Sequence, residues 1–405
     1  MKTTRIIAAI AVAALVPIGL AACSTTSSAP ASTSHLKLTV EDYFASPQVA
    51  VYDSIYKSCA AAEGDTITST HVPGAGLIAK VLQQSSSKTL PDVLMLDNPD
   101  VQQIASSGAL SPLKNYGITG KGVSPGVVSA GTYKGELYGL APAVNSLALF
   151  YNKDILTAAG ITPPTTWAEL TTDAKALTTS AHYGFAFSGV NTYEGTWQFM
   201  PWMWSNGGSE AQLDSTENAQ ALALLTGLVK DGSASASVDS WAQSDVDNQF
   251  IAGKTAMMEN GPWQIPSLDA KTSLHWGYVP LPTRTADQTS QAPLGGETFN
   301  VPNTGDKAKM AAAGKLVACI NNAKNAGAIA KANLYIPSNE AAATAFGQAN
   351  PALAGFAKII ADARARTALL GAKWPAAATT IYTAEQLSLT GKATPTAAFA
   401  QAANG

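Results

Sequence analysis

Charged side chains are scarce in this sequence: Asp, Glu, Lys and Arg make up 13% of the 405 residues, against about 25% in an average soluble domain. The formal net charge is −3, and no long run of basic residues occurs. Proteins that bind nucleic acid neutralise its phosphates with clustered Lys and Arg. The composition therefore argues against nucleic acid as a partner.

Signature motifs of several enzyme classes are missing as well. The sequence has no Gly-x-Ser-x-Gly and no His-Glu-x-x-His motif, and its four histidines are scattered without metal-ligand spacing. A Gly-x-Gly-x-x-Ala stretch that begins at Gly74 has the outline of a dinucleotide-binding fingerprint, but the strand expected before it is mostly polar. We therefore expect no metal and no cofactor.

Long apolar runs are also absent after Cys23, so no membrane-spanning helix of ~20 residues is expected there. The N-terminal apolar run, 6–20, follows Lys2 and Arg5 and ends in Leu20-Ala21-Ala22-Cys23. These features predict a cleaved signal over 1–22, and the last four residues resemble the lipobox of bacterial lipoproteins, in which the cysteine becomes lipidated. Residues 23–35, rich in Ser and Thr, would then be a flexible lipidated tether. This predicts an extracytoplasmic protein held at the outer face of the cell membrane only by lipid; the alternative is a secreted protein without lipid.

The chain beyond the tether is long enough for two domains of ~100–200 residues each. Its first part predicts strands over 36–40, 66–72 and 92–96, with helices over 49–62 and 76–84 between them. Such a β-α-β-α-β series indicates a parallel sheet with right-handed crossovers, whose ligands lie at the carboxyl ends of the strands.

Similar patterns continue to the C-terminus. Thr166 is expected to cap a helix over 168–177. The other predicted helices cover 153–159, 217–230, 245–251, 306–322, 340–346, 352–369 and 376–389, and the other predicted strands cover 147–151, 255–258, 275–279 and 298–301.

The eight tryptophans are the positive functional signal, because all of them lie between positions 167 and 374. Trp197, Trp241, Trp263 and Trp374 are predicted to lie in or beside loops that carry amides or carboxylates. A sugar has an apolar face that stacks on an aromatic ring and hydroxyls that need donors and acceptors. These four tryptophans therefore favour a sugar site, with ordinary core packing as the alternative for each.

The two cysteines that remain after Cys23 are Cys59 and Cys319. An oxidising compartment favours a disulfide between them, and two separate buried thiols are the alternative.

A set of short motifs, weak singly, is specific in its order along the chain. They are Pro91-Asp92-Val93, Gly108-Ala109-Leu110-Ser111-Pro112-Leu113, Gly135-Glu136-Leu137-Tyr138-Gly139-Leu140-Ala141-Pro142, Phe150-Tyr151-Asn152-Lys153-Asp154, Pro164-Thr165-Thr166-Trp167-Ala168-Glu169-Leu170, Phe250-Ile251-Ala252-Gly253-Lys254-Thr255-Ala256-Met257-Met258 and Asn260-Gly261-Pro262-Trp263. With them the chain beyond the tether resembles the extracellular solute-binding proteins of ABC transporters, in particular the sugar-binding group that includes maltose- and trehalose-binding proteins.

The resemblance implies an α/β architecture, the two-lobe periplasmic-binding-protein fold of type II, in which each lobe is a mainly parallel sheet flanked by helices and the ligand lies between the lobes. The N-terminal lobe would comprise 36–143 and 293–338, and the C-terminal lobe 144–292 and 339–405. Chain crossings between them are expected near 141–146, 293–301 and 335–339. This arrangement places Cys59 and Cys319 on helices of one lobe, which strengthens the disulfide interpretation.

The resemblance also implies the ligand-binding residues. The family positions fall on Asp97, Asn98, Asn145, Trp197, Trp263, Gly295, Gly296 and Glu297, and we add Gln198, Trp241, Trp374 and, from the N-terminal loop, Phe44 and Ser46. No cluster of Arg or Lys accompanies these positions, which argues against a phosphorylated ligand.

The resulting hypothesis is a monomeric receptor, not an enzyme, that binds a neutral di- or oligosaccharide and delivers it to the permease subunits of an ABC transporter by hinge closure. The alternative is an extracytoplasmic glycoside hydrolase with a carboxylate pair drawn from Glu194, Asp245, Glu259 and Glu297.

Overall fold

The computed structural model describes residues 35–46 and 48–404. The expected signal segment, the lipidated Cys23 and the tether up to residue 34 lie outside the described residues. Among the residues that are described, no helix combines the length and the apolar character needed to cross a membrane.

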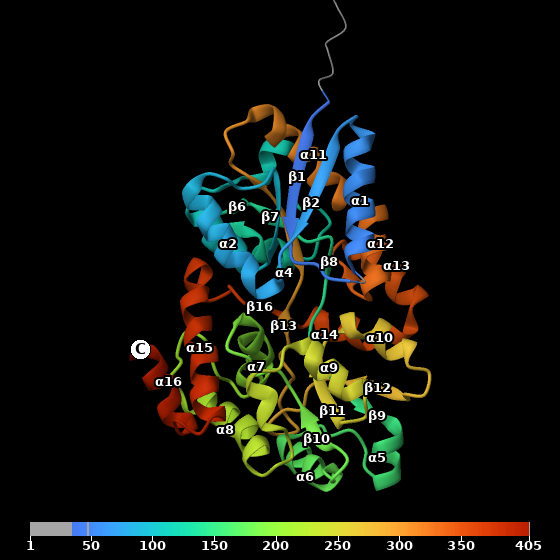
Figure 1. Ribbon diagram of the computed structural model, residues 1–405, viewed down its shortest axis with the longest axis vertical. Helices are drawn as coiled ribbons and strands as arrows, with labels where there is room; N and C mark the ends of the chain where they lie inside the picture. The colour runs from blue at the N-terminus through green and yellow to red at the C-terminus, as the bar shows by residue number, and fades with distance from the viewer. Residues whose placement is uncertain (1–34, 47, 405) are drawn as a thin grey trace, which may run out of the picture. The chain divides into compact units, whose positions relative to one another are not determined.

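The first three predicted strands belong to a 6-stranded sheet of order β2-β1-β3-β14-β4, with β7 also paired to β14 (Figure 1). Its strands are β1 (Lys37–Asp42), β2 (Thr66–His71), β3 (Val93–Asp97), β4 (Leu110–Ser111), β7 (Gly139–Leu140) and β14 (Glu297–Pro302). Helices α1 (Gln48–Ala62) and α2 (Gly74–Ser87) connect β1 to β2 and β2 to β3. Both pairs made by β1 are parallel, so the predicted β-α-β-α-β series is confirmed.

A 4-stranded sheet of order β10-β11-β9-β12 lies in the lower half of Figure 1. It contains β9 (Ala148–Asn152), β10 (Tyr183–Ala186), β11 (Thr255–Asn260) and β12 (Trp276–Val279). Both sheets belong to one compact unit that begins at His35.

The expectation that each sheet is mainly parallel was wrong. Only β1–β2, β1–β3 and β10–β11 are parallel among the pairs of the two large sheets, and β14 and β9 run antiparallel to their neighbours. A parallel neighbour requires a crossover connection within one sheet. Because β9 and β14 enter from the other sheet, no such crossover constrains their direction.

Three short pairings join the segments that pass between the two sheets. Strand β8 (Ala143–Val144) pairs with β15 (Ile336–Pro337), β13 (Pro293–Leu294) pairs with β16 (Arg364–Ala365), and Asn145 forms an isolated bridge with Gly295. The segments 143–145, 293–297 and 336–337 coincide with the crossings expected from the sequence.

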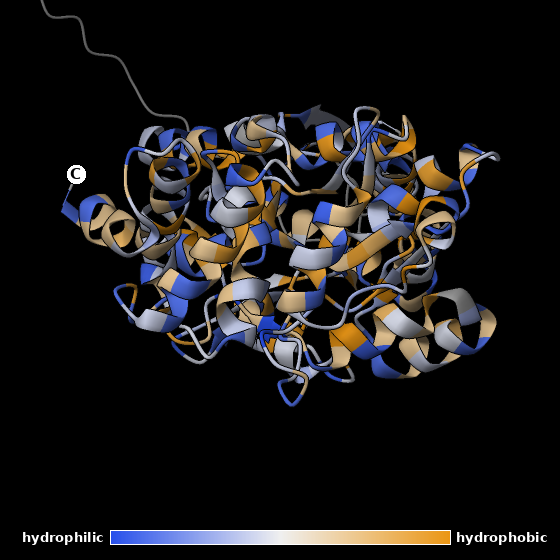
Figure 2. Cartoon of the chain, turned by 90° about the horizontal axis from the view of Figure 1, so that it is seen from below, coloured by the Kyte–Doolittle hydropathy of each residue, from blue (hydrophilic) through white to orange (hydrophobic). Residues whose placement is uncertain are grey.

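Local signals explain several helix boundaries. Thr166 caps α6 (Trp167–Leu177), as predicted, and the structure adds a capping box with Glu169. Asn152 caps α5 (Lys153–Ala159), which ends at Gly160 with φ 67°. The remaining helices are α3 (Asp100–Ser106), α4 (Pro125–Ala130), α7 (Tyr193–Ser205), α8 (Thr216–Lys230), α9 (Gln243–Ile251), α10 (Ile265–Ala270), α11 (Lys307–Ile320), α12 (Ala323–Asn333), α13 (Glu340–Ala349), α14 (Ala354–Ala361), α15 (Trp374–Leu389) and α16 (Pro395–Asn404). In Figure 2 most helices alternate hydrophilic and hydrophobic segments, as expected where one face is buried.

Two local predictions need correction. The helix expected over 352–369 ends at Ala361, because the following residues pair with β13 as strand β16, a tertiary contact that overrides the apolar pattern. The polar loop expected around Trp197 is helix α7, which begins after the N-cap Thr192 and is buried over most of its length. The glycine and polar residues at its start concealed it.

Cys59 on α1 and Cys319 on α11 form a disulfide, with Cα atoms 5.9 Å apart. The predicted pairing is therefore confirmed. It joins two helices that pack together beside the 6-stranded sheet.

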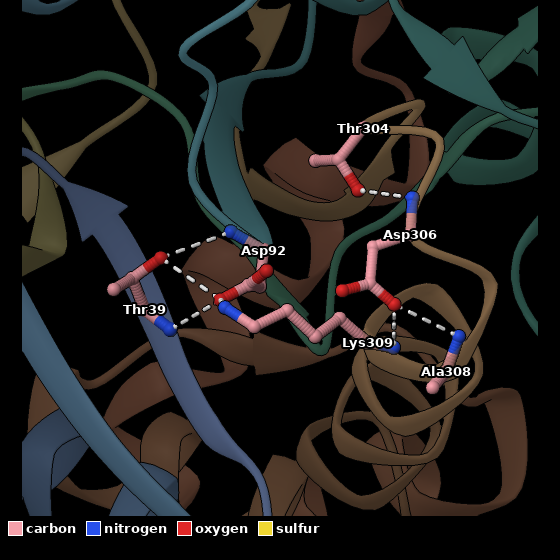
Figure 3. A network of polar contacts seen from close by, with 6 residues as sticks. All are labelled: Thr39, Asp92, Thr304, Asp306, Ala308 and Lys309. Atoms are coloured by element: carbon pink, nitrogen blue, oxygen red, sulfur yellow. Dashed lines mark hydrogen bonds and ion pairs between the residues drawn. The ribbon is translucent and has the colours of Figure 1, made fainter. Parts of the chain in front are cut away.

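A second connection holds α11 to the same sheet (Figure 3). The Asp92 carboxylate accepts hydrogen bonds from the Thr39 backbone N–H at 2.8 Å and from Lys309 Nζ at 3.1 Å. Asp306 caps α11 by accepting from the N–H groups of Ala308 and Lys309, each at 3.1 Å. Asp92 precedes β3 at the end of the strand opposite Asp97, so this motif residue is structural.

Candidate functional site

A cavity of about 510 Å3 lies between the two large sheets. One wall comes from the ends of β1 and β3 and the starts of β14 and α2, and the other from the starts of α7 and α9 and the turn after β11. Its volume is within the ~300–1,000 Å3 of typical small-molecule sites. Its lining residues are Tyr43, Gln48, Gly74, Leu77, Ile78, Asp97, Asp100, Asn145, Asn191, Thr192, Tyr193, Glu194, Trp197, Gln243, Trp263, Gly295, Gly296, Glu297, Tyr335, Arg366 and Tyr382.

The cavity brings together most of the residues that the family resemblance selected: Asp97, Asn145, Trp197, Trp263, Gly295, Gly296 and Glu297. They come from positions separated by up to about two hundred residues in the sequence. The carboxyl end of β3 supplies Asp97, as expected for a ligand at the end of a parallel strand.

Other predicted residues lie outside the cavity, and their placement corrects the prediction. Trp374 is fully buried and packs edge-on against Tyr193, with ring centroids 5.4 Å apart. Phe44 is buried and stacks on Tyr52 at 3.5 Å. Both aromatic side chains serve the core because neighbouring rings cover their faces.

The polar residues placed elsewhere are held by backbone groups or exposed. Asn98 is buried and donates to the Leu294 carbonyl at 3.0 Å. Gln198 accepts from the Ser188 N–H at 2.6 Å and lies behind the cavity wall. Ser46 is exposed, and the half-buried Trp241 packs against buried hydrophobic side chains without lining the cavity.

The turn Gly295-Gly296 brings the backbone close to the floor of the cavity. Gly295 exchanges backbone hydrogen bonds with Asn145, at 2.9 and 3.4 Å. A Cβ atom at position 295 would lie 1.9 Å from Asn145 Oδ1 and 2.8 Å from the Trp197 ring, and Gly296 has φ 141°. Only glycine fits these two positions without displacing lining residues.

We expect Gly295→Ala to weaken ligand binding by at least about tenfold and to lower the free energy of unfolding by about 1–3 kcal/mol, because the added methyl displaces Asn145 and Trp197. Calorimetric titration and urea unfolding measure the two effects. The matched control is Gly227→Ala, because Gly227 lies within α8 with no atom within 4 Å of an added Cβ. Wild-type affinity in the Gly295 variant would contradict the tight packing.

Arg366 is the residue that the sequence interpretation missed. It is 2% exposed, follows β16 and makes a bidentate ion pair with Asp97, in which Nη1 lies 2.7 Å from Oδ2. Its guanidinium lies over the Trp197 ring at 4.5 Å and over the Trp374 ring at 5.5 Å. It was missed because its segment had been predicted as the interior of a helix.

Two aromatic rings in the cavity differ in access. One face of Trp197 is covered by Arg366, and the residue is 6% exposed. Trp263 is half-buried, and its ring lies so close to Gly261 that a Cβ there would be 2.0 Å away. The backbone of the Asn-Gly-Pro turn therefore supports the Trp263 ring and leaves it as the more accessible stacking surface.

Four carboxyl groups, those of Asp97, Asp100, Glu194 and Glu297, belong to the polar lining. Glu297 accepts from the Tyr43 hydroxyl at 3.1 Å, and burial, followed by the neighbouring Asp97, raises its pKa to about 7. Burial and then Asp97 raise the pKa of Asp100 to about 8. Burial also raises the pKa of Glu194, which accepts from the Gln243 N–H.

The other carboxylates considered for a hydrolase have structural partners. Glu259 is fully buried and accepts from Trp202 Nε1 at 2.7 Å. Asp245 caps α9 by accepting from the Ala242 N–H at 2.9 Å. This leaves Glu194 and Glu297 as the members of that set that line the cavity.

Comparisons with solved structures give the fold. The chain is similar to the GacH receptor of Streptomyces glaucescens GLA.O, solved without ligand and with acarbose, with 23% identity, a TM-score of 0.80 and coverage of 91% of this chain and 97% of that one. It is also similar to maltose-bound MalE3 of T. maritima, with 22% identity, a TM-score of 0.82 and coverage of 91% and 98%. The chain therefore has the two-lobe fold of type II periplasmic binding proteins, with the cavity between the lobes.

Sequence relatives agree with this fold. A putative binding protein of Brucella abortus (strain 2308) is 29% identical over 65% of this chain and 66% of its own length. A maltooligosaccharide ABC transporter solute-binding lipoprotein of Streptococcus pneumoniae (strain ATCC BAA-255 / R6) is 25% identical over 75% of this chain and 73% of its own length. The model of the bacterial extracellular solute-binding protein family matches residues 54–355. This chain belongs to the bacterial extracellular solute-binding protein family.

Proposed function

We propose that this protein is the receptor of an ABC transporter and that it captures a neutral di- or oligosaccharide in the cavity between its lobes. The observation that carries the proposal is the accessible Trp263 ring in a cavity whose rim carries carboxylates, amides and tyrosine hydroxyls. A pyranose needs this combination, because its C–H face stacks on an aromatic ring while its hydroxyls need hydrogen-bond partners. The relatives that bind maltose, acarbose or maltooligosaccharides support the same ligand class.

Delivery to the permease would follow from hinge closure around the bound sugar. The proposed lobes are 36–143 with 293–338 and 144–292 with 339–405, as expected from the sequence. We further propose a monomer whose lipidated Cys23 anchors it outside the cell membrane. The family of extracellular solute-binding proteins supports the extracytoplasmic location.

A receptor is favoured over a glycoside hydrolase. Asp97 is held in an ion pair by Arg366, and Glu259 and Asp245 have structural partners and do not line the cavity. The relatives are named as binding proteins. Incubation with the bound sugar distinguishes the two functions, since a receptor returns its ligand intact.

The central test is a thermal-shift screen of mono-, di- and oligosaccharides, followed by Trp263→Ala. A bound sugar should raise the melting temperature, because binding to the native state adds about 2.7 kcal/mol at a hundredfold excess over the dissociation constant. Trp263→Ala should weaken binding by more than about tenfold, or about 1.4 kcal/mol, with little change in the empty protein.

The matched control for Trp263→Ala is Trp202→Ala, because Trp202 is fully buried in the same lobe. Its loss should destabilise the empty protein by about 3–5 kcal/mol. If Trp263→Ala reduced the stability of the empty protein and left the affinity unchanged, Trp263 would be a core residue and not a ligand-binding residue. A screen without any shift would contradict the proposed function.

A further inference from the structure

Two carboxyl groups of the cavity face each other across neighbouring strands. Glu297 on β14 is the direct register partner of Asp97 on β3 in an antiparallel pair. Directly opposed residues have Cβ atoms about 4.5–5.5 Å apart, and like charges at such positions repel each other. Asp100, at the start of α3, lies in the same cluster, since Asp97 raises its pKa. Two or three negative charges therefore compete for one small volume.

The available positive charge is already used. Among the described residues that line the cavity, Arg366 is the only Lys or Arg, against Asp97, Asp100, Glu194 and Glu297. Its bidentate pair commits Nη1 and Nη2 to Asp97. A neutral sugar brings no further positive charge, so a proton is the available means of removing a negative charge from the pair.

The surroundings of Glu297 favour its neutral form. Glu297 is 8% exposed, and burial is the largest cause that raises its pKa. The titratable and charged groups that interact with it are Tyr43 after β1, Tyr52 on α1, Asp97 on β3, Tyr335 before β15 and Arg366 after β16. The tyrosines are neutral near pH 7, and Arg366 is held by Asp97, so no free cation faces the Glu297 carboxyl.

The geometry points to different roles for the two carboxyl groups: Asp97 pairs with Arg366, and Glu297 meets the bound sugar as a neutral carboxylic acid that donates a hydrogen bond. The Tyr43 hydroxyl donates to Oε1, so Oε2 is the oxygen that would carry the acidic proton toward the sugar. Glu297 therefore selects an acceptor oxygen of the ligand. This inference rests on the proposed binding of a neutral sugar.

The test is calorimetric titration with maltose, maltotriose and trehalose across the pH range. Because the donor proton is lost with a midpoint of about 7, the association constant should fall about 30-fold between about pH 6 and about pH 8.5. Glu297→Gln places an amide donor at the same position. Its affinity should change little with pH, because the amide keeps its donor across the range.

Matched variants assign the effect to one group. Asp247→Asn removes another buried carboxyl group, which lies outside the cavity and whose pKa is raised to about 6 by burial. In this variant the association constant should still fall with pH as in the wild type. If the association constant stopped falling with pH in Asp100→Asn but still fell in Glu297→Gln, the assignment of the effect to Glu297 would be overturned. Affinity that is independent of pH, or that rises with pH, would overturn the neutral acid; a rise would indicate a ligand with positive charge.

An infrared measurement on the empty protein separates this inference from the proposed function. The carbonyl band of a carboxylic acid should disappear between about pH 6 and about pH 8.5 in the wild type, and that component should be missing in Glu297→Gln. If the infrared differences between the two pH values were identical in the wild type and in Glu297→Gln, the protonation of Glu297 would be overturned even where a sugar binds. Failure of every sugar to bind would overturn the proposed function, and the infrared result would still decide the state of Glu297.

Discussion

Reduction of the disulfide between Cys59 and Cys319 is expected to lower the free energy of unfolding by about 4–5 kcal/mol. The bond joins residues 260 positions apart, so it removes a large loop-closure entropy from the unfolded chain. It also joins α1 to α11, which already pack against each other in the fold, so the bond forms without displacing either helix.

Urea unfolding with and without reductant measures this effect. The double variant Cys59→Ser with Cys319→Ser is the matched control, because its unfolding midpoint should be low and should not change with reductant. Alkylation of both thiols in the unfolded, unreduced protein would contradict the disulfide. Equal midpoints for the oxidised and reduced protein would contradict its contribution to stability.

Arg366→Met is expected to lower the free energy of unfolding by about 2–4 kcal/mol and to weaken sugar binding by more than about tenfold. Breaking a buried ion pair leaves one charge without its partner, which costs about 3–5 kcal/mol at full burial. Since the Asp97 side chain is 26% exposed, we expect a smaller loss from the ion pair. The variant also loses the cation–π contact with Trp197, worth about 0.5–2 kcal/mol.

Two further variants separate charge from geometry. Arg366→Lys keeps a positive charge but cannot make the bidentate pair or stack equally well on the indole. Its stability should therefore lie between those of the wild type and Arg366→Met. Arg366→Met combined with Asp97→Asn removes the unpaired charge and should recover part of the lost stability. Urea unfolding measures all four proteins, and a wild-type midpoint in Arg366→Met would contradict the importance of the pair.

The predictions that succeeded depend on signals contained in short stretches of sequence. The N-cap at Thr166 and the alternation of strand and helix over 36–97 could be recognised because each signal is local in the sequence. The failures were of a different kind. The segment 352–369 has the composition of a helix, but its second half pairs with β13, and no local signal reports that partner.

The same distinction applies to the site. Asp97, Asn145, Trp263 and Glu297 were found because they belong to motifs with recognisable neighbours. Arg366 was not found, because its role depends on the Asp97 carboxylate 269 positions away. Trp374 was assigned to the site because a tryptophan beside a proline resembles a loop aromatic, whereas the fold buries it against Tyr193.

The sequence by itself determined the order of the strands and helices, the family and seven of the residues that line the cavity, because periodicity, caps and motif order are properties of the chain. Only the tertiary structure decided the mixed direction of both sheets, the pairing of Arg366 with Asp97 and the opposition of Asp97 and Glu297 across β3 and β14. Electrostatic interactions and the burial of a side chain depend on distances in space. Those distances are set by strands that cross from one lobe to the other, and no short stretch of sequence contains them.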